Sequence, residues 1–427
     1  MQDNHYLIPK ITKPFDEAIE LPGSKSIALR QMGMCAMSKG KSVLHGIPIC
    51  DDSLAMASCL EKLGLSINIT DTVIEITGPM NLADPVTLDA RMSGASARIL
   101  IALAALRSGI THIDGHKSLR ARTNQPLLDV LEKAGCQIES SNGHLPLSIR
   151  GPIKRVSPLT IDGSISSQYV TALLIISVGL GSPITDRIVI HGELVSKPYI
   201  DITLNEMQKR GIHANWEANQ TIRIDRQAGY QNKEIQVEGD ATAATYAATL
   251  ACLHQGKVAF TNLGNSSQQG DYQYLEILKS LGAKVVSTES STTIEGPEQL
   301  KIPEPIDMKS MPDAALTLIA LAPLLGGETT ISGLSSLHHK ECDRLECPAA
   351  EMSKMGIAVE TTHETITIQP VALDRIKEVT LSTYHDHRMA MAFSLIGSVT
   401  GRLTIDAQNV VDKTYPSFWN DYQKLCG

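Results

Sequence analysis

The sequence has few aromatic residues, no excess of basic charge and no long hydrophobic run. Phe, Trp and Tyr make up only 4% of its 427 residues, so the hydrophobic core has to be built mainly from Ala, Leu, Ile, Val and Met. The formal net charge is −8, whereas proteins that bind nucleic acids in general carry a basic excess. A general nucleic-acid binder is therefore excluded, although a local cluster of cations could still hold a small anion.

Further absences exclude membrane and disulfide-bonded classes. The longest apolar stretches, at 170–180 and 314–325, are shorter than the roughly 20 residues that a membrane-spanning helix needs. The first residues lack the basic and apolar regions of a signal peptide. The eight cysteines include no Cys-x-x-Cys pair, which is typical of reduced, buried thiols. We therefore expect a cytoplasmic protein with no disulfide frame and no zinc site.

A glycine that follows a basic helical turn recurs through the chain. The six glycines are separated by 71, 76, 71, 74 and 71 residues: Gly64, Gly135, Gly211, Gly282, Gly356 and Gly427. Glycine in this place favours the left-handed conformation that ends a helix. Small or polar residues begin an alanine-rich helix in the same frame, near residues 23, 93, 163, 239, 312 and 385. Two features with one period predict six α/β repeats, each with two helices and roughly four strands.

The chain is longer than one hydrophobic core usually supports, so the repeats have to be divided between domains. The last repeat ends at Gly427 without the strand that follows this glycine in other repeats, and the strand-like residues 5–9 could supply it. We therefore predict one domain from both termini, 1–23 and 239–427, and a middle domain, 24–238, with three repeats each. Glycine and proline at 21–24 and 238–240 mark the two crossings.

The N-termini of the predicted helices contain the residues that could bind a ligand. A helix N-terminus offers unpaired N–H groups and the positive end of its dipole, so several starts at one cleft form an anion site. Cations stand at these starts, at Lys25, Arg98 and Arg388. The segment 23–26 is not a phosphate-binding P-loop, because its glycine and lysine spacing is wrong. The pattern predicts a cation-lined cleft between the two domains that binds small anions.

Taken singly, these residues have simpler interpretations. An isolated basic side chain, such as Arg122, Arg344 or Lys413, is typical of a solvated surface. Asp313 follows a proline and is typical of a helix N-cap or first turn. The segment 385–387, His-Asp-His, has metal-binding residue types, but no further ligand stands at a suitable spacing, so no metal site is predicted.

Seven motifs, in order and over essentially the whole chain, resemble the 5-enolpyruvylshikimate-3-phosphate synthase (3-phosphoshikimate 1-carboxyvinyltransferase) family. They are LPGSKS at 21–26, DGSISSQ at 162–168, SKPYID at 196–201, EGD at 238–240, PDAA at 312–315, KECDRL at 340–345 and DHRMAM at 386–391. The resemblance implies a two-domain enolpyruvyl transferase fold, an inside-out α/β barrel of six βαβαββ repeats. It also implies transfer of the enolpyruvyl group of phosphoenolpyruvate to the 5-hydroxyl of shikimate 3-phosphate, with release of phosphate. This is a step of the shikimate pathway to chorismate and the aromatic amino acids, and the target of glyphosate.

By the same resemblance, one set of residues would bind phosphoenolpyruvate: Lys25, Gly94, Arg122, Gln168, Arg344, Arg388 and Lys413. A second set would bind shikimate 3-phosphate: Lys25, Ser26, Arg30, Ser166, Ser167, Gln168, Ser196, Asp313 and Lys340. Both substrates are multiply anionic, and guanidinium groups grip carboxylates and phosphates through paired hydrogen bonds. We expect no metal and no cofactor, because lysine and arginine neutralise the phosphate.

The implied reaction adds an alcohol across the enol double bond and then eliminates phosphate. It needs a base for the hydroxyl and an acid for the methylene carbon. The resemblance assigns the base to Asp313 and the acid to Glu341, with Lys25 near both. We expect neighbouring cations to keep Asp313 ionised at neutral pH.

The sequence departs from the family at two positions. Met92 stands where an asparagine is usual near the phosphoenolpyruvate pocket, and a thioether cannot donate a hydrogen bond. Ser336 stands where an asparagine usually contacts the acceptor phosphate. These departures leave open an enolpyruvyl transferase with a different hydroxy-acid acceptor. A non-catalytic paralogue would have lost Asp313 or Glu341, and the uridine-sugar branch would have a cysteine within 121–126, which is absent. We expect a monomer with no nucleic-acid or membrane partner.

Overall fold

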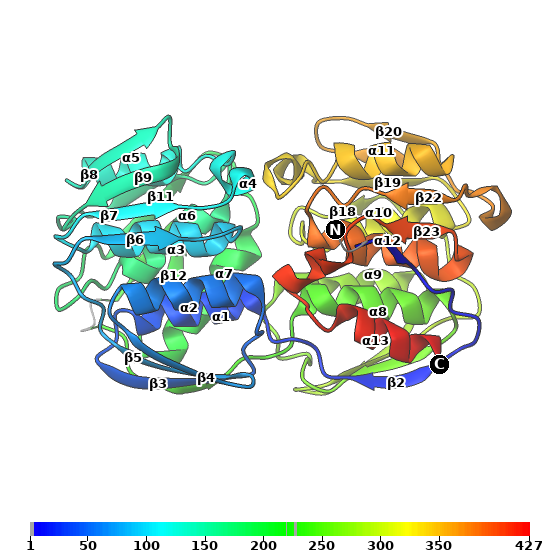
Figure 1. Ribbon diagram of the computed structural model, residues 1–427, viewed down its shortest axis with the longest axis horizontal. Helices are drawn as coiled ribbons and strands as arrows, with labels where there is room; N and C mark the ends of the chain where they lie inside the picture. Colours follow the sequence, from blue (N-terminus) through cyan, green and yellow to red (C-terminus); the bar gives the residue numbers. More distant parts are fainter. Residues whose placement is uncertain (1–3, 219, 226–228) are drawn as a thin grey trace. The chain divides into compact units, whose positions relative to one another are not determined.

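The computed structural model describes residues 4–218, 220–225 and 229–427. Contacts within the chain divide it into two compact units. One consists of Met1–Pro22 with Glu238–Gly427, here the terminal unit, and the other of Gly23–Val237, here the middle unit. The chain therefore passes between the units twice, at 22–23 and at 237–238 (Figure 1).

The middle unit contains three four-stranded sheets, ordered β14-β3-β5-β4, β6-β7-β9-β8 and β10-β11-β13-β12. In each sheet the first pair of strands is parallel and the other two pairs are antiparallel. The strands are β3 (Gly40–His45), β4 (Ser66–Thr70), β5 (Val73–Gly78), β6 (Val86–Asp89), β7 (Thr111–Asp114), β8 (Gln137–Ser141), β9 (His144–Arg150), β10 (Leu159–Asp162), β11 (Arg187–His191), β12 (Ala214–Ala218), β13 (Thr221–Ile224) and β14 (Glu234–Gln236). The helices are α1 (Lys25–Cys35), α2 (Asp51–Lys62), α3 (Gly94–Ala105), α4 (Lys117–Arg120), α5 (Gln125–Lys133), α6 (Ser167–Ile176) and α7 (Lys197–Lys209).

The terminal unit repeats this plan, with sheets ordered β16-β17-β15-β2, β18-β19-β21-β20 and β1-β23-β22. Its strands are β1 (Tyr6–Leu7), β2 (Asp16–Ile19), β15 (Lys257–Phe260), β16 (Lys284–Ser287), β17 (Thr292–Glu295), β18 (Ile306–Asp307), β19 (Thr329–Ser332), β20 (Val359–Thr361), β21 (Ile366–Ile368), β22 (Val379–Leu381) and β23 (Leu403–Ile405). Its α-helices are α8 (Ala241–Leu253), α9 (Tyr274–Ser280), α10 (Ala315–Leu321), α11 (Glu346–Met355), α12 (His387–Thr400) and α13 (Phe418–Cys426). Short 3-10 turns are η1 (Gly270–Gln273), η2 (Ala322–Leu324), η3 (Ser335–His339), η4 (Leu373–Arg375) and η5 (Gln408–Lys413).

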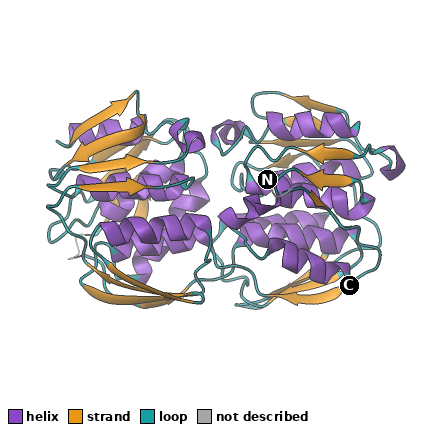
Figure 2. Ribbon diagram, viewed as in Figure 1, coloured by secondary structure: helices purple, strands orange, loops and turns teal. Residues whose placement is uncertain are grey.

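The helices form the inside of each unit and the sheets the outside (Figure 2). Helices α3, α6, α8 and α12 are buried over nearly their whole length. A helix that is apolar all round is stable only when neighbours cover every side, which explains their Ala, Leu and Ile content. The strands bury alternate residues, as in β9, because only one face of each sheet packs on the helices. This inside-out α/β arrangement is the fold class expected from the sequence.

Residues from both termini meet in one sheet. Strand β1 pairs antiparallel with β23, with Tyr6 opposite Ile405, and fills the place next to β22 and β23. The strand before each crossing pairs with a strand that is distant in the sequence. Strand β2, which precedes α1, pairs with β15 of the terminal unit, whereas β14, which precedes α8, pairs with β3 of the middle unit.

The repeat glycines adopt the backbone conformation that the sequence predicts. The φ angles of Gly64, Gly135, Gly211, Gly282, Gly356 and Gly427 lie between 81° and 108°. A residue with a Cβ is strained in this region, so glycine ends each helix there without cost.

The burial of the cysteine side chains differs in part from the prediction that all of them are buried. Five of the eight are buried, but Cys342, Cys347 and Cys426 are half-buried.

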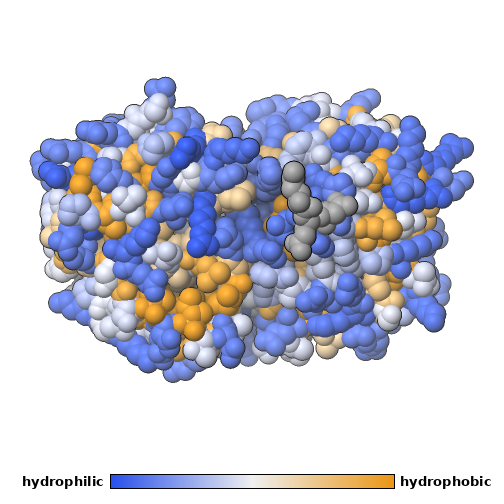
Figure 3. Space-filling model, in the orientation of Figure 1, coloured by the Kyte–Doolittle hydropathy of each residue, from blue (hydrophilic) through white to orange (hydrophobic). Residues whose placement is uncertain are grey.

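In the described part of the chain no helix combines the length and apolar character needed to cross a bilayer. One face of the molecule is mainly hydrophilic, with hydrophobic side chains gathered on the lower part of the middle unit in this view (Figure 3).

Candidate functional site

A single carboxylate in the terminal unit contacts three cations. Asp313 Oδ1 accepts hydrogen bonds from Lys340 Nζ at 2.9 Å and Arg344 Nη1 at 3.1 Å, and its Oδ2 accepts from Arg388 Nη2 at 3.1 Å. Burial alone would raise the pKa of Asp313, but the charges of these three neighbours hold it well below the usual carboxyl value. Asp313 is therefore ionised at neutral pH.

Arg344 is the centre of this cluster. Its side chain is 1% exposed and donates from Nε and Nη2 to the two carboxylate oxygens of Asp386, at 2.7 and 3.1 Å. Nη2 also donates to Glu341 Oε2 at 2.9 Å. Burial would lower the pKa of Arg344, but these carboxylates raise it above the ordinary value. The arginine is permanently charged and fixed in orientation.

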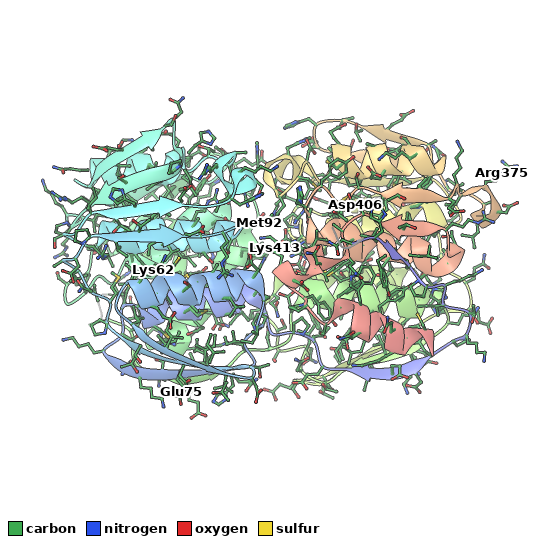
Figure 4. The ribbon with its side chains drawn as sticks, viewed as in Figure 1. Lys62, Glu75, Met92, Arg375, Asp406 and Lys413 are labelled. Carbon is green, nitrogen blue, oxygen red and sulfur yellow. The ribbon has the colours of Figure 1, made fainter. Side chains whose placement is uncertain are left out.

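Glu341 joins a further cation to the cluster. Its Oε1 lies 3.6 Å from Lys413 Nζ, and the Lys413 side chain is only 6% exposed. Lys413 ends η5, which packs against α12, the helix that begins next to Arg388 (Figure 4). Asp313, Lys340, Glu341, Arg344, Arg388 and Lys413, together with Asp386, are the acid–cation cluster of the terminal unit.

Two of the simpler interpretations are wrong here. The N-cap of α10 is Ala314, which makes no side-chain cap, and Asp313 binds the three cations instead. Arg344 and Lys413 are buried in ion pairs rather than solvated. Asp386 binds Arg344, and among the described residues no three His, Cys, Asp or Glu side chains form a group suited to a metal ion.

The middle unit has further candidate site residues at the N-termini of three helices. Lys25, at the start of α1, pairs with Asp52 of α2 at 3.1 Å, and the Asp52 side chain is 2% exposed. The carbonyl of Asp52 accepts a hydrogen bond from Ser96 Oγ, in the first turn of α3, at 3.5 Å. Helices α1, α3 and α6 begin at the serine N-caps Ser24, Ser93 and Ser166. These caps satisfy one backbone N–H each.

Gly94 and Arg122 lie against each other at the start of α3. A Cβ on Gly94 would lie 2.5 Å from Arg122 Nη1 and 2.8 Å from Arg98 Nη1, so a larger residue would displace these guanidinium groups. Arg98 is held by the carbonyls of Gly94 and Thr123, at 3.1 Å each. The Arg122 guanidinium forms no hydrogen bond or ion pair with the residues that the structure describes. It is a cation with its donors available at a helix N-terminus, which is the arrangement an anion needs.

Arg30 ties α1 to the helices that carry the remaining candidates. It donates to Thr203 Oγ1 at 2.8 Å, to the Tyr199 carbonyl at 2.9 Å, to Thr171 Oγ1 at 3.3 Å and to the Ser26 carbonyl at 2.7 Å. Burial lowers its pKa to about 10. Of the five N–H donors of an arginine, most are thus used within the unit, so Arg30 is chiefly an anchor in this structure.

Ser166 and Ser196 mark two further points of this site. The hydroxyl of Ser166 accepts from the backbone N–H of Gln168, and Oε1 of Gln168 is buried without a partner among the described residues. Ser196, at the start of α7, has φ 54° and ψ 44°, a strained conformation for a serine, and its side chain makes no cap. Ser167 is buried in the first turn of α6.

The structure thus places the predicted residues in two groups. The terminal unit brings together Asp313, Lys340, Glu341, Arg344, Arg388 and Lys413. The middle unit holds Lys25, Ser26, Arg30, Gly94, Arg122, Ser166, Ser167, Gln168 and Ser196 at the starts of α1, α3, α6 and α7 and in the loop before α5. Met92 lies directly before the N-cap of α3 (Figure 4). Ser336 lies in η3, four residues before Lys340.

Sequence reasoning missed two carboxylates that hold the cations. Asp386 was visible only as part of a motif, although it both caps α12 through the Arg388 N–H at 2.9 Å and binds Arg344. Asp52 gave no signal beyond being an acid in the first turn of a helix, and its partner Lys25 is 27 residues earlier.

Comparisons with known proteins identify the family of the chain. A family model described as EPSP synthase (3-phosphoshikimate 1-carboxyvinyltransferase) matches residues 9–422. The chain is 36% identical to the 3-phosphoshikimate 1-carboxyvinyltransferase of Haemophilus influenzae (strain ATCC 51907 / DSM 11121 / KW20 / Rd) over 423 residues, which cover 96% of each chain. It is also 36% identical, over 422 residues and 96% of each chain, to the enzyme of that name from Histophilus somni (strain 2336).

Solved structures show the same fold. The EPSP synthase of Acinetobacter baumannii, at 22% sequence identity, superposes with a TM-score of 0.77 over 99% of this chain and 98% of its own. The family model and the curated relatives both span nearly the whole chain. The chain therefore belongs to the EPSP synthase (3-phosphoshikimate 1-carboxyvinyltransferase) family.

Proposed function

We propose that this protein transfers the enolpyruvyl group of phosphoenolpyruvate to the 5-hydroxyl of shikimate 3-phosphate, giving 5-enolpyruvylshikimate 3-phosphate and phosphate. Family membership supports the reaction, and the chemistry of the two groups of site residues supports their roles.

The observation that carries the proposal is the ionised Asp313 among Lys340, Arg344 and Arg388. A carboxylate must be deprotonated to accept a proton from a hydroxyl, and its cationic neighbours keep it so. The same cations attract the phosphate and carboxylate groups of the substrates. In the proposed complex the phosphate and carboxylate groups of the substrates bind some of these cations. Asp313 is then free to accept the hydroxyl proton as the base.

The reaction then proceeds by addition and elimination. Asp313 removes the proton of the 5-hydroxyl as its oxygen attacks C2 of phosphoenolpyruvate, and Glu341 donates a proton to the methylene carbon. Loss of phosphate from this tetrahedral adduct, with return of a methylene proton, restores the double bond. Lys25, Arg122, Arg344 and Lys413 neutralise the phosphate that leaves.

The identity of the acceptor substrate needs a test of its own, because Met92 and Ser336 depart from the family pattern. Both replace an amide of the family pattern, so an enolpyruvyl transferase for another hydroxy acid is the alternative. Phosphate release is measured with phosphoenolpyruvate and either shikimate 3-phosphate or shikimate. We expect turnover only with shikimate 3-phosphate. No turnover with it at millimolar concentration, in a protein that folds and binds phosphoenolpyruvate, would reject the proposed acceptor.

The proposal also includes a cytoplasmic location, which the scattered cysteines favour. It further includes a monomeric state. Sedimentation equilibrium should give the mass of one chain with and without substrates. A stable dimer would replace this part of the proposal without affecting the chemistry.

A further inference from the structure

A histidine that the proposed mechanism does not use stands two residues before a member of the acid–cation cluster. His338 belongs to η3, and its side chain is half-buried, with 19% of it exposed. Its Nδ1 lies 2.7 Å from Asp343 Oδ2, and its Nε2 lies 2.9 Å from the backbone carbonyl oxygen of His363. Both ring nitrogens therefore have a partner within hydrogen-bond distance.

Both of these partners only accept hydrogen bonds. A backbone carbonyl carries no donor. Burial would raise the pKa of Asp343, but hydrogen bonds from His338 and from the N–H groups of Leu345 and Glu346 hold it below the usual carboxyl value, so Asp343 is ionised. A neutral imidazole has one N–H and can donate to only one of the two acceptors, whereas the imidazolium donates to both. The geometry therefore favours the protonated ring.

The charges around the ring act in both directions. Burial would lower the pKa of His338, but the hydrogen bonds with Asp343 and the His363 carbonyl, together with the charge of Glu346 at the start of α11, raise it above the ordinary histidine value. Three ionisable groups oppose the charge when they are protonated: the ring of His363, stacked on His338 with centroids 4.9 Å apart, and His339 and Lys340 of the same segment.

The bonds of His338 fix the segment that carries two cations of the cluster. The carbonyl of Leu337, in η3, accepts from the backbone N–H groups of Lys340 and Arg344, at 3.4 and 3.2 Å. The ring of His338 joins η3 to the side chain of Asp343 in the same loop and to the turn between β20 and β21. Both cations bind the same carboxylate oxygen of the proposed base. The place of η3 therefore decides where these cations lie relative to that base.

We propose that His338 is a positioning residue of the transferase, whose imidazolium form holds η3 on the loop before α11 and so keeps Lys340 and Arg344 in place for the anionic substrates. This effect rests on the proposed function, since it is read through substrate binding. Loss of the ring proton leaves one of the two acceptors without its donor. Because folding raises the pKa of His338, the stabilisation from its charge is complete below 6.5 and is lost as the pH rises through the folded value.

The first arm of the test needs no activity. The full-length protein is isotope-labelled at the histidine rings, and the ring signals of His338, which are absent from His338→Gln, are followed by NMR as the pH changes. We expect a titration midpoint above 6.5, with both ring nitrogens protonated below that midpoint. A midpoint at or below 6.5 would overturn the proposal.

Asp343→Asn tests whether this carboxylate holds the ring proton. Asparagine keeps one carbonyl oxygen for the N–H groups at the start of α11, but it presents an NH2 donor to His338 in place of the second carboxylate oxygen. We expect a lower midpoint than in the wild type, and a neutral ring with Nδ1 unprotonated and Nε2 donating to the His363 carbonyl. An unchanged midpoint would contradict the proposal.

The second arm measures substrate binding through phosphate release. The KM of His338→Gln for shikimate 3-phosphate, divided by the wild-type KM, should be about fivefold at about pH 6. It should return toward one above the wild-type midpoint, where the wild-type ring is also neutral. Ionisation of the substrate cancels in this ratio, and kcat should change less than KM. A ratio of one at about pH 6, or a raised ratio that does not change with pH, would overturn the proposal.

The matched control is His363→Gln, which removes the neighbouring ring but keeps the backbone carbonyl that His338 binds. It should follow the wild type at both pH values, and the same loss in this variant would contradict the role of His338. If the wild type has no transferase activity, the proposed function fails, while the NMR titration still decides the protonation of His338.

Discussion

Asp386→Asn is the substitution for which the structure gives the clearest magnitude. The Asp386 side chain is fully buried and makes two charge-assisted hydrogen bonds to the buried Arg344, as well as capping α12. Breaking a buried ion pair costs about 3–5 kcal/mol. We expect the lower end, about 3 kcal/mol, because Asn keeps one carbonyl acceptor and Arg344 keeps Asp313 and Glu341.

This loss is measurable as a shift in melting temperature. In a unit of about 200 residues, 1 kcal/mol shifts Tm by about 2–4 °C, so differential scanning calorimetry should show a decrease of about 6–12 °C. The matched control is Glu295→Gln, which removes a carboxylate from an exposed pair with Lys284 in the same unit. Its Tm should change by less than about 2 °C, because exposed pairs contribute little.

The variant should also bind phosphoenolpyruvate at least about tenfold more weakly, because Arg344 and the first turn of α12 lose their common anchor. Titration calorimetry, at a temperature where the variant is folded, measures this. A variant with wild-type Tm and wild-type affinity would refute the conclusion that Asp386 positions the two arginines.

The remaining predictions concern the proposed base and the pocket of the middle unit. Asp313→Asn should lower kcat by about 10²–10⁴, the usual contribution of a general base, with a smaller change in KM; an unchanged kcat would exclude that role. Because the pKa of Asp313 is lowered by folding, the stabilisation from its charge is complete above the unfolded value of 3.8 and is lost as pH falls through the folded value. The Tm difference between the wild type and this variant should thus be constant from pH 7 to about 5 and disappear only below 3.8; loss of the difference near neutral pH would contradict the assignment. Gly94→Ala should raise the KM for phosphoenolpyruvate, because the added Cβ would lie 2.5 Å from Arg122 Nη1 and would displace this guanidinium group. An unchanged KM would argue against phosphoenolpyruvate binding beside Gly94 and Arg122. Met92→Asn should change the inhibition constant of glyphosate more than the affinity for shikimate 3-phosphate, and equal changes would place Met92 elsewhere.

The repeat architecture could be predicted from the sequence because its signals are local. Each repeat glycine is needed for a positive φ angle at one helix end, so its spacing is visible without knowledge of distant contacts. The strand order at the crossings could not be predicted in the same way. The pairing of β2 with β15 joins segments about 240 residues apart, and short strands give little register information.

The pattern of helix starts predicted an anion site, but the roles of its individual residues were predictable only through the resemblance. Asp313 has the local appearance of an N-cap, and only the folded chain shows that its partners come from positions 27, 31 and 75 residues later. Asp386 does cap a helix, as its local sequence suggests, but it also forms an ion pair with Arg344 that the local sequence does not indicate.

The most direct test of addition and elimination is to run the reaction in heavy water. The wild-type protein is incubated with phosphoenolpyruvate and shikimate 3-phosphate, and the ether product is analysed by mass spectrometry and NMR. Because the methylene carbon is protonated before phosphate leaves, we predict one phosphate released per ether formed and deuterium in the methylene group of the product. An ether product without deuterium, or phosphate released without an ether, would contradict this account.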